Sequence, residues 1–151
     1  MRSAQNAAKF WNKRTDTYLA SNNKVYSISY DITVICVDQL CKFENNNTYE
    51  LVDSFKSHET AGSCLQKHKI NVLRSYSLFH PITKVESTTG AHEIGHTLGM
   101  SDTEYGIMSH SQNEFRSESI AHENLQQMLN SDVGEYDLLS KLINLIFNYD
   151  W

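Results

Sequence analysis

Two histidines four residues apart, with a glutamate beside the first, stand in the stretch AHEIGHTLGMSD, which begins at Ala91. On a helix, residues four apart share one face, so the imidazoles of His92 and His96 could both reach one Zn²⁺ at about 2.0 to 2.1 Å. Glu93 would lie close enough to a zinc-bound water to act as its general base without ligating the metal. The spacing indicates a hydrolytic zinc site, although HExxH also occurs on ordinary solvated helices.

Two further residues complete the longer pattern HExxHxxGxxD. A third ligand six residues after His96 cannot reach the metal if the helix continues straight. Gly99 can adopt a left-handed conformation without a Cβ penalty and end the helix there. Asp102 can then offer a carboxylate oxygen as third ligand, with the fourth position open for water. Because its charge partly offsets that of Zn²⁺, we expect the site to acidify water less than three histidines would, which makes Glu93 more important.

The motif HExxHxxG, with a third ligand three residues later and a short loop leading to GIM, resembles the metzincin metallopeptidases. In that family a methionine turn runs beneath the zinc, and Met108 is the matching methionine. Asp102 stands where metzincins more often have histidine, so the motif looks most like the snapalysin-type branch. It is also similar to zincin domains at the C-termini of polymorphic bacterial toxins. The motif resemblance covers about residues 87–110.

The resemblance implies further roles around the metal. In some metzincin branches a tyrosine two residues after the methionine contacts the metal or the oxyanion, and this chain has His110 there. We therefore expect His110 to donate a hydrogen bond to the tetrahedral intermediate, with Tyr105 as a second candidate. The resemblance also implies a substrate extended along an edge strand, which we expect within residues 70–79, while the segment after Met108 walls the pocket beyond the scissile bond.

Each of these residues also has an ordinary structural interpretation. Asp102 could be a turn aspartate, in which case His110 or Glu118 would replace it as ligand. Met108 could simply fill the core, since a turn methionine is itself a packing residue. The remaining histidines have no ligand spacing and are expected on the surface or in the core: His58, His68, His80 and His122.

The composition favours one soluble globular domain of 151 residues, long enough for one core and too short for two. A formal net charge of -5 offers no basic footprint, so nucleic acid and anionic membranes are not expected as partners. No apolar stretch approaches the roughly 20 residues of a membrane helix. Three cysteines stand in no CxxC pair and are expected mainly as buried thiols: Cys36, Cys41 and Cys64.

The order of predicted elements is helix, strands, helix, loop and helix, which indicates an α+β fold with a small mixed sheet. Apolar residues at helical spacing predict an N-terminal helix within residues 3–18. Ser87, Thr88 and Thr89 are candidate caps of the active-site helix. Alternating stretches predict strands over residues 25–37 and 68–79, and within residues 44–55 a polar turn leads into another strand. Helical patterns cover residues 117–130 and 135–147. The metzincin resemblance implies that these elements form a zincin-like fold.

The leading functional prediction is a zinc-dependent endopeptidase in which Glu93 deprotonates the metal-bound water and returns the proton to the leaving amine. The alternative is a zinc-holding structural or interaction module without turnover. The expected partners are a protein or peptide substrate and an inhibitor or immunity protein, and the chain is expected to be a monomer.

No apolar run near the N-terminus could form the core of a secretory signal. Many metzincins begin with a strand before the first helix, whereas the first predicted helix here follows Met1 directly. We therefore expect residues 1–151 to form one metallopeptidase domain excised from a longer chain. We expect it to be secreted, or delivered to a target cell as a toxin, by a route other than a signal peptide, with a cytoplasmic location as the alternative.

Overall fold

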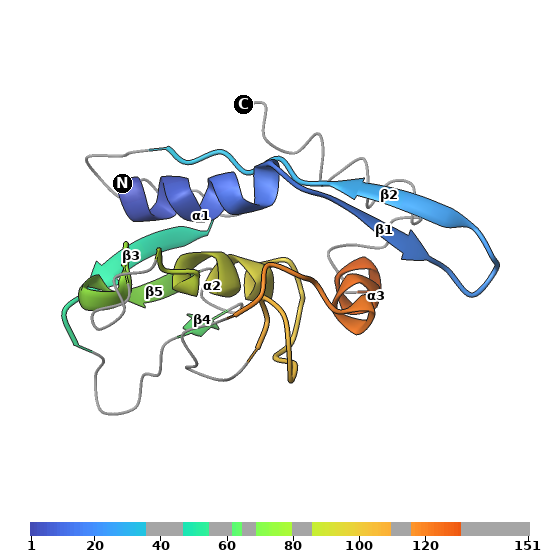
Figure 1. Ribbon diagram of the computed structural model, residues 1–151. Coiled ribbons are helices and arrows are strands. Elements are labelled where there is room, and N and C mark those ends of the chain that lie inside the picture. The colour runs from blue at the N-terminus through green and yellow to red at the C-terminus, as the bar shows by residue number, and fades with distance from the viewer. Residues whose placement is uncertain (36–46, 55–61, 65–68, 80–85, 110–115, 131–151) are drawn as a thin grey trace.

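The described part of the chain contains three α-helices and two small sheets (Figure 1). The computed structural model describes residues 1–35, 47–54, 62–64, 69–79, 86–109 and 116–130. These elements form the small mixed α+β fold that the sequence predicted, while its metzincin-like arrangement stays a prediction. None of the helices in these ranges combines the length and apolarity needed to cross a membrane.

The first helix, α1 (Arg2–Asn12), confirms the predicted N-terminal helix but is shorter than predicted. Trp11 on its inner face is fully buried and donates its indole N–H to the carbonyl oxygen of Ala91, 2.9 Å away. Tyr18, which the periodicity places on this helix, lies instead on strand β1 (Thr15–Leu19). The stretch TDTYL alternates threonines with larger residues, and this pattern favours an extended chain over a further helical turn.

Strand β1 pairs antiparallel with β2 (Val25–Ser29) to form a hairpin. Asn23 adopts a left-handed φ of 61° in the connecting turn, a conformation that asparagine tolerates better than most residues. The strand predicted over residues 25–37 therefore ends at Ser29, and the chain continues without regular structure to residue 35. Residues 36–37 lie outside the described ranges.

The second sheet has the strand order β3, β5, β4. The middle strand, β5 (Lys69–Leu73), runs parallel to β3 (Thr48–Val52) and antiparallel to β4 (Gly62–Cys64). Ile70 and Val72 on β5 are buried, as expected for a central strand. The prediction of one mixed sheet is therefore corrected to two sheets within the described residues, because the β1–β2 hairpin pairs by itself.

This topology also corrects the edge strand predicted within residues 70–79. The first part of that segment is the central strand β5, and after Leu73 the chain enters the 3₁₀-helix η2 (Arg74–Tyr76). A strand with neighbours on both sides cannot accept a further strand. The described edges of the sheet are β3 and β4, and β4 contacts the helix that carries the HExxH motif.

That helix, α2 (Thr89–Thr97), contacts α1 on one side and strands β4 and β5 on the other (Figure 1). Of the three candidate caps, Thr88 occupies the N-cap position but makes no side-chain capping bond. The hydroxyl of Ser87 instead accepts a hydrogen bond from the backbone N–H of Thr89 at 3.3 Å. The motif helix is thus packed against both α1 and the second sheet.

The third helix, α3 (His122–Asn130), contacts β1 and confirms part of the helix predicted over residues 117–130. The helix predicted over residues 135–147 lies outside the described residues, as do Cys36 and Cys41. One apolar core joins the helices and sheets. Its fully buried apolar members include Trp11, Ile28, Val72, Ile107 and Met108.

Candidate metal centre

The two motif histidines lie on one face of α2 with their ring centroids 4.6 Å apart. Their Nε2 atoms face each other at 3.1 Å. The separation follows directly from the helical repeat, which superposes side chains four residues apart. His92 is buried and His96 is partly exposed, so the pair is covered on one side and open on the other.

Backbone carbonyls determine which nitrogen of each ring carries the proton. Nδ1 of His92 lies 3.0 Å from the carbonyl oxygen of Ile107, and Nδ1 of His96 lies 2.9 Å from that of Met100. A carbonyl oxygen can only accept, so each Nδ1 must be the donor. In the neutral rings both Nε2 atoms therefore present lone pairs, which is the tautomer that binds a metal through Nε2.

Gly99 ends the helix and reverses the chain as its position in the motif predicts. Its φ is 89°, in the left-handed region where a side chain would be strained. The N–H of Gly99 bonds the carbonyl of His96 at 3.0 Å, and the N–H of Met100 bonds that of Gly95 at 3.1 Å. These two bonds form a Schellman motif, and the chain that leaves it returns toward the histidines.

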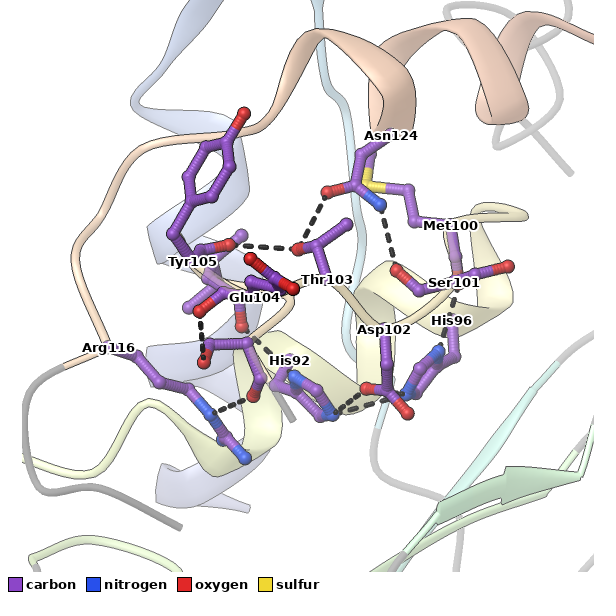
Figure 2. Close-up of polar contacts among 12 residues, drawn as sticks. His92, His96, Met100, Ser101, Asp102, Thr103, Glu104, Tyr105, Arg116 and Asn124 are labelled. Carbon is purple, nitrogen blue, oxygen red and sulfur yellow. Dashed lines mark hydrogen bonds and ion pairs between the residues drawn. The ribbon is translucent and has the colours of Figure 1, made fainter. Parts of the chain in front are cut away.

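Asp102 lies at the end of this return, beside both rings. Its Oδ1 is 3.4 Å from Nε2 of His92 and 3.5 Å from Nε2 of His96 (Figure 2). Two ligands bound about 2.05 Å from a tetrahedral metal stand about 3.3 Å apart, so the spacing of these three atoms fits one small cation. Within the described ranges, these three residues are the group whose donor atoms lie close enough to hold a metal.

The chemistry of the donor set also fits a cation. Two imidazole lone pairs and a carboxylate oxygen are all electron-rich, and they repel one another when nothing positive lies between them. Imidazole nitrogen with carboxylate oxygen in an open three-ligand set is typical of catalytic zinc. The side chain of Asp102 is 39% exposed against 7% for His92, so the site opens to solvent on the aspartate side.

Helix α3 fixes the loop that carries Asp102. The side-chain amide of Asn124, which is fully buried, donates to the carbonyl of Ser101 at 2.8 Å and its oxygen accepts from the Thr103 hydroxyl at 3.4 Å. Oε1 of Gln127 accepts the backbone N–H of Ser101 at 2.8 Å. The residues on both sides of Asp102 are therefore bound to α3 (Figure 2). No spacing in the sequence marks Asn124 for this task.

Met108 packs directly against the motif helix. It is fully buried, and a Cβ placed on Gly95 would collide with its Sδ atom, so the helix can approach the methionine only with glycine there. The backbone N–H of Thr103 also donates to the carbonyl of Met108 at 2.8 Å. Met108 thus supports both the helix and the Asp102 loop, and its neighbour Ile107 orients His92.

Glu93 is almost completely buried on α2, next to His92. Its carboxylate acts electrostatically on residues from two other segments. Burial raises the pKa of the Tyr49 phenol on β3, and the negative charge of Glu93 raises it further. Burial lowers the pKa of Arg116, whereas the charges of Glu93 and Asp102 oppose that change.

Arg116 was not singled out by any sequence pattern. Its Nε donates a hydrogen bond to the carbonyl oxygen of Ser109, 3.0 Å away, in the turn that follows Met108. Burial, and after it the positive charge of Arg116, lower the pKa of His92 to about 4. The ring of His92 is therefore neutral at pH 7, as ligation of a metal requires.

Other candidate residues lie apart from the centre or outside the described ranges. Tyr105 is 58% exposed, and its ring points away from the cluster in Figure 2. Glu118 forms an exposed ion pair with Lys13 at 3.8 Å, and His122 stacks on Tyr18 with centroids 4.9 Å apart. The histidines outside the described residues are His58, His68, His80 and His110.

Comparison with known proteins adds no relative to this picture. No family model, no curated protein and no solved structure matches the chain. The resemblance to metzincins therefore depends on the motif residues alone.

Proposed function

We propose that this chain is a zinc-dependent endopeptidase whose metal ligands are His92, His96 and Asp102. The observation that carries the proposal is the convergence of three electron-pair donors. The two histidine Nε2 atoms lie 3.1 Å apart, and Oδ1 of Asp102 lies 3.4 and 3.5 Å from them. The tautomers of both histidines are set by carbonyl acceptors, which is the outer-shell arrangement of metal-ligating imidazoles.

When bound, Zn²⁺ supplies a Lewis acid that polarises the scissile carbonyl and acidifies water. Glu93 adjoins the first ligand and would take the proton of the attacking water and return it to the leaving amine. Glu93 is almost completely buried, which shields its carboxylate from bulk water. The side chains of His92 and His96 have no proton to exchange at Nε2, so the proton transfers fall to Glu93.

The substrate peptide would lie along strand β4. This strand is a described edge of the second sheet and contacts α2, whereas the segment expected from the sequence is central. An extended peptide can add to such an edge through main-chain hydrogen bonds, which recognise a polypeptide with little regard to its side chains. This arrangement favours a protein or peptide as the substrate class.

The deciding experiment separates metal binding from turnover. Glu93→Gln should retain one zinc per chain, measured by elemental analysis after dialysis, and lose cleavage of unfolded protein substrates, measured by mass spectrometry. Glu123→Gln is the matched control, because Glu123 is an exposed glutamate on α3. Proteolysis retained in purified Glu93→Gln protein would refute Glu93 as the general base.

A structural zinc module is the second candidate. Its support is the clamp of Asn124 on the Asp102 loop, since a bound metal would then connect α2 to α3. Such a module should bind one zinc, lose thermal stability when the metal is removed, and cleave none of the tested substrates. The cleavage assay therefore separates it from the enzyme.

We further propose that the enzyme acts as a delivered toxin on proteins of a target cell. Growth of a bacterial host should stop when the wild-type chain is expressed and continue with Glu93→Gln at the same expression level. Equal toxicity of the wild type and Glu93→Gln would show that growth arrest does not depend on catalysis and would refute the toxin proposal. If the chain has an immunity protein, co-expression of that protein should restore growth of the host.

A further inference from the structure

The positively charged side chain of Arg116 lies beside the candidate metal ligands. It has no part in the proton transfers assigned to Glu93. Arg116 extends from the segment before α3 toward His92 (Figure 2). It is partly buried, although arginine is usually exposed. A guanidinium held at the edge of a metal centre requires a structural or chemical reason.

The turn below the motif helix fixes the orientation of this side chain. Nε of Arg116 donates to the carbonyl oxygen of Ser109 at 3.0 Å. Ser109 is itself buried, and its N–H donates to the carbonyl of Gly106 at 3.1 Å. Because Nε is engaged with the backbone, the two Nη groups form the end of the side chain that is directed to other acceptors.

The guanidinium, which Figure 2 shows on the side of His92, interacts electrostatically with three residues of the centre. The charge of Arg116 acts on His92, and the carboxylates of Glu93 and Asp102 act on Arg116. A guanidinium stays protonated at any pH at which the protein is folded. Arg116 therefore contributes a permanent positive charge to the site.

That charge compensates for the aspartate ligand. A divalent cation with the carboxylates of Glu93 and Asp102 has no net charge, whereas a third histidine in place of Asp102 would have left it positive. A developing oxyanion is stabilised by positive charge and by donors aimed at it. With Arg116 included, the centre keeps one positive charge.

We propose that Arg116 is the anion-binding residue of this centre and that its Nη groups donate to the oxygen on which negative charge develops during peptide hydrolysis. The proposal rests on the endopeptidase function proposed above. It gives to Arg116 the role that the metzincin resemblance implied for His110, which lies outside the described residues.

A purely structural role for Arg116 makes a different prediction. In that case the guanidinium would only neutralise the buried carboxylates, and its removal would lower stability and metal affinity without a specific effect on bound anions. Anion affinity at constant metal content therefore distinguishes the two roles. The measurement does not require turnover.

The experiment uses the full chain loaded with Co²⁺, titrated with inorganic phosphate, and followed by the visible spectrum of the metal. Arg116→Gln should weaken phosphate binding by about tenfold or more, since hydrogen bonds to charged groups contribute about 1.5 to 3 kcal/mol. Arg74→Gln is the control with the same change of charge, because Arg74 is exposed and pairs with Asp53. It should bind phosphate like the wild type.

Activity provides the second measurement. Arg116→Gln should lower kcat for peptide cleavage by about 100-fold, while KM changes little, because the lost donor acts mainly in the transition state. Equal phosphate affinity in wild type and Arg116→Gln, both loaded with Co²⁺, would overturn the proposal. Phosphate binding that depends on Arg116 in a protein that cleaves nothing would support the anion site and refute the endopeptidase.

A conservative variant covers the case in which Arg116→Gln fails to fold. Arg116→Lys keeps the charge but cannot donate to Ser109 and to an anion through separate nitrogens. It should bind phosphate several-fold more weakly than the wild type and retain Co²⁺. Wild-type affinity in this variant would overturn the proposal, and a wild-type chain that binds no Co²⁺ would overturn the metal centre as well.

Discussion

The helix and the loop of the proposed metal centre position the three candidate ligands in different ways. His92 and His96 meet because the α-helix repeats, so their proximity needs no other part of the chain. Asp102 reaches the same point only through the Gly99 turn and the bonds of Asn124 to the neighbouring residues. Local spacing thus provides two ligands, whereas the third depends on a distant helix.

Removing a helix ligand should have the largest effect. His96→Ala should lower zinc affinity by more than the 10- to 100-fold that loss of an outer-shell partner typically costs, because it removes a group expected to bind the metal directly. Asp102→Ala should cost less, since water can replace one carboxylate oxygen. Competition with a chelator measures both.

His122→Ala is the matched control for His96→Ala. His122 lies on α3, is exposed, and among its described hydrogen bonds donates from Nε2 to the carbonyl oxygen of Leu19 at 3.3 Å. Its removal should leave zinc affinity unchanged. A larger loss for Asp102→Ala than for His96→Ala would show that the loop dominates the site.

Breaking the clamp of α3 should have an intermediate effect. Asn124→Ala removes both the donor to the Ser101 carbonyl and the acceptor of the buried Thr103 hydroxyl, so zinc affinity should fall by about 10- to 100-fold and stability by about 1 to 3 kcal/mol. Chelator competition and urea unfolding of the apo protein check the two effects separately. Asn130→Ala, at an exposed position on the same helix, is the control.

Unchanged zinc affinity in folded Asn124→Ala would mean that the Gly99 turn alone places Asp102. The contrast between helix and loop would then disappear, because both parts would be determined by local sequence. If Asn124→Ala lowers metal affinity without lowering stability, α3 serves specifically to position the Asp102 loop, which strengthens the contrast between helix and loop.

Filling the space beneath the helix should have the smallest effect on the metal. Gly95→Ala forces the helix away from Met108 and should lower stability by about 1 to 3 kcal/mol, although alanine is otherwise the better helix former. Thermal unfolding measures the change. The double variant Gly95→Ala with Met108→Ala should lose less than the sum of the two single changes.

If the stability losses of the two single variants simply add in the double variant, the Met108 side chain does not limit how closely the turn packs against Gly95. Gly95 is not itself a candidate ligand, so zinc affinity should change by less than in Asn124→Ala. This order of effects tests whether packing and ligation are separate functions of α2.

The parts of the site that the sequence predicted are those with local causes. The shared face of His92 and His96 follows from helical spacing, and the left-handed turn follows from the identity of Gly99. The small α+β fold follows from the order of the periodic segments. Each of these needs only neighbours in the chain.

The missed features depend on contacts between distant segments. Asn124 lies on another helix than the loop it holds, and Arg116 reaches Ser109 through its side chain, so no periodicity marks either residue. The strand β1 was missed because TDTYL continues the apolar spacing of the preceding helix. The central position of β5 depends on its pairing with β3 and β4. The residue pattern of one strand does not show which strands pair with it.

Gly95 has a consequence for the transfer of this motif to another protein. In HExxH the two inner letters stand for any residue, yet here one of them is fixed by a methionine from a later turn. The same turn provides the Ile107 carbonyl that selects the tautomer of His92. The smallest transplantable unit is therefore the helix together with the turn through Met108, because a grafted helix alone would carry the ligands without the groups that orient them.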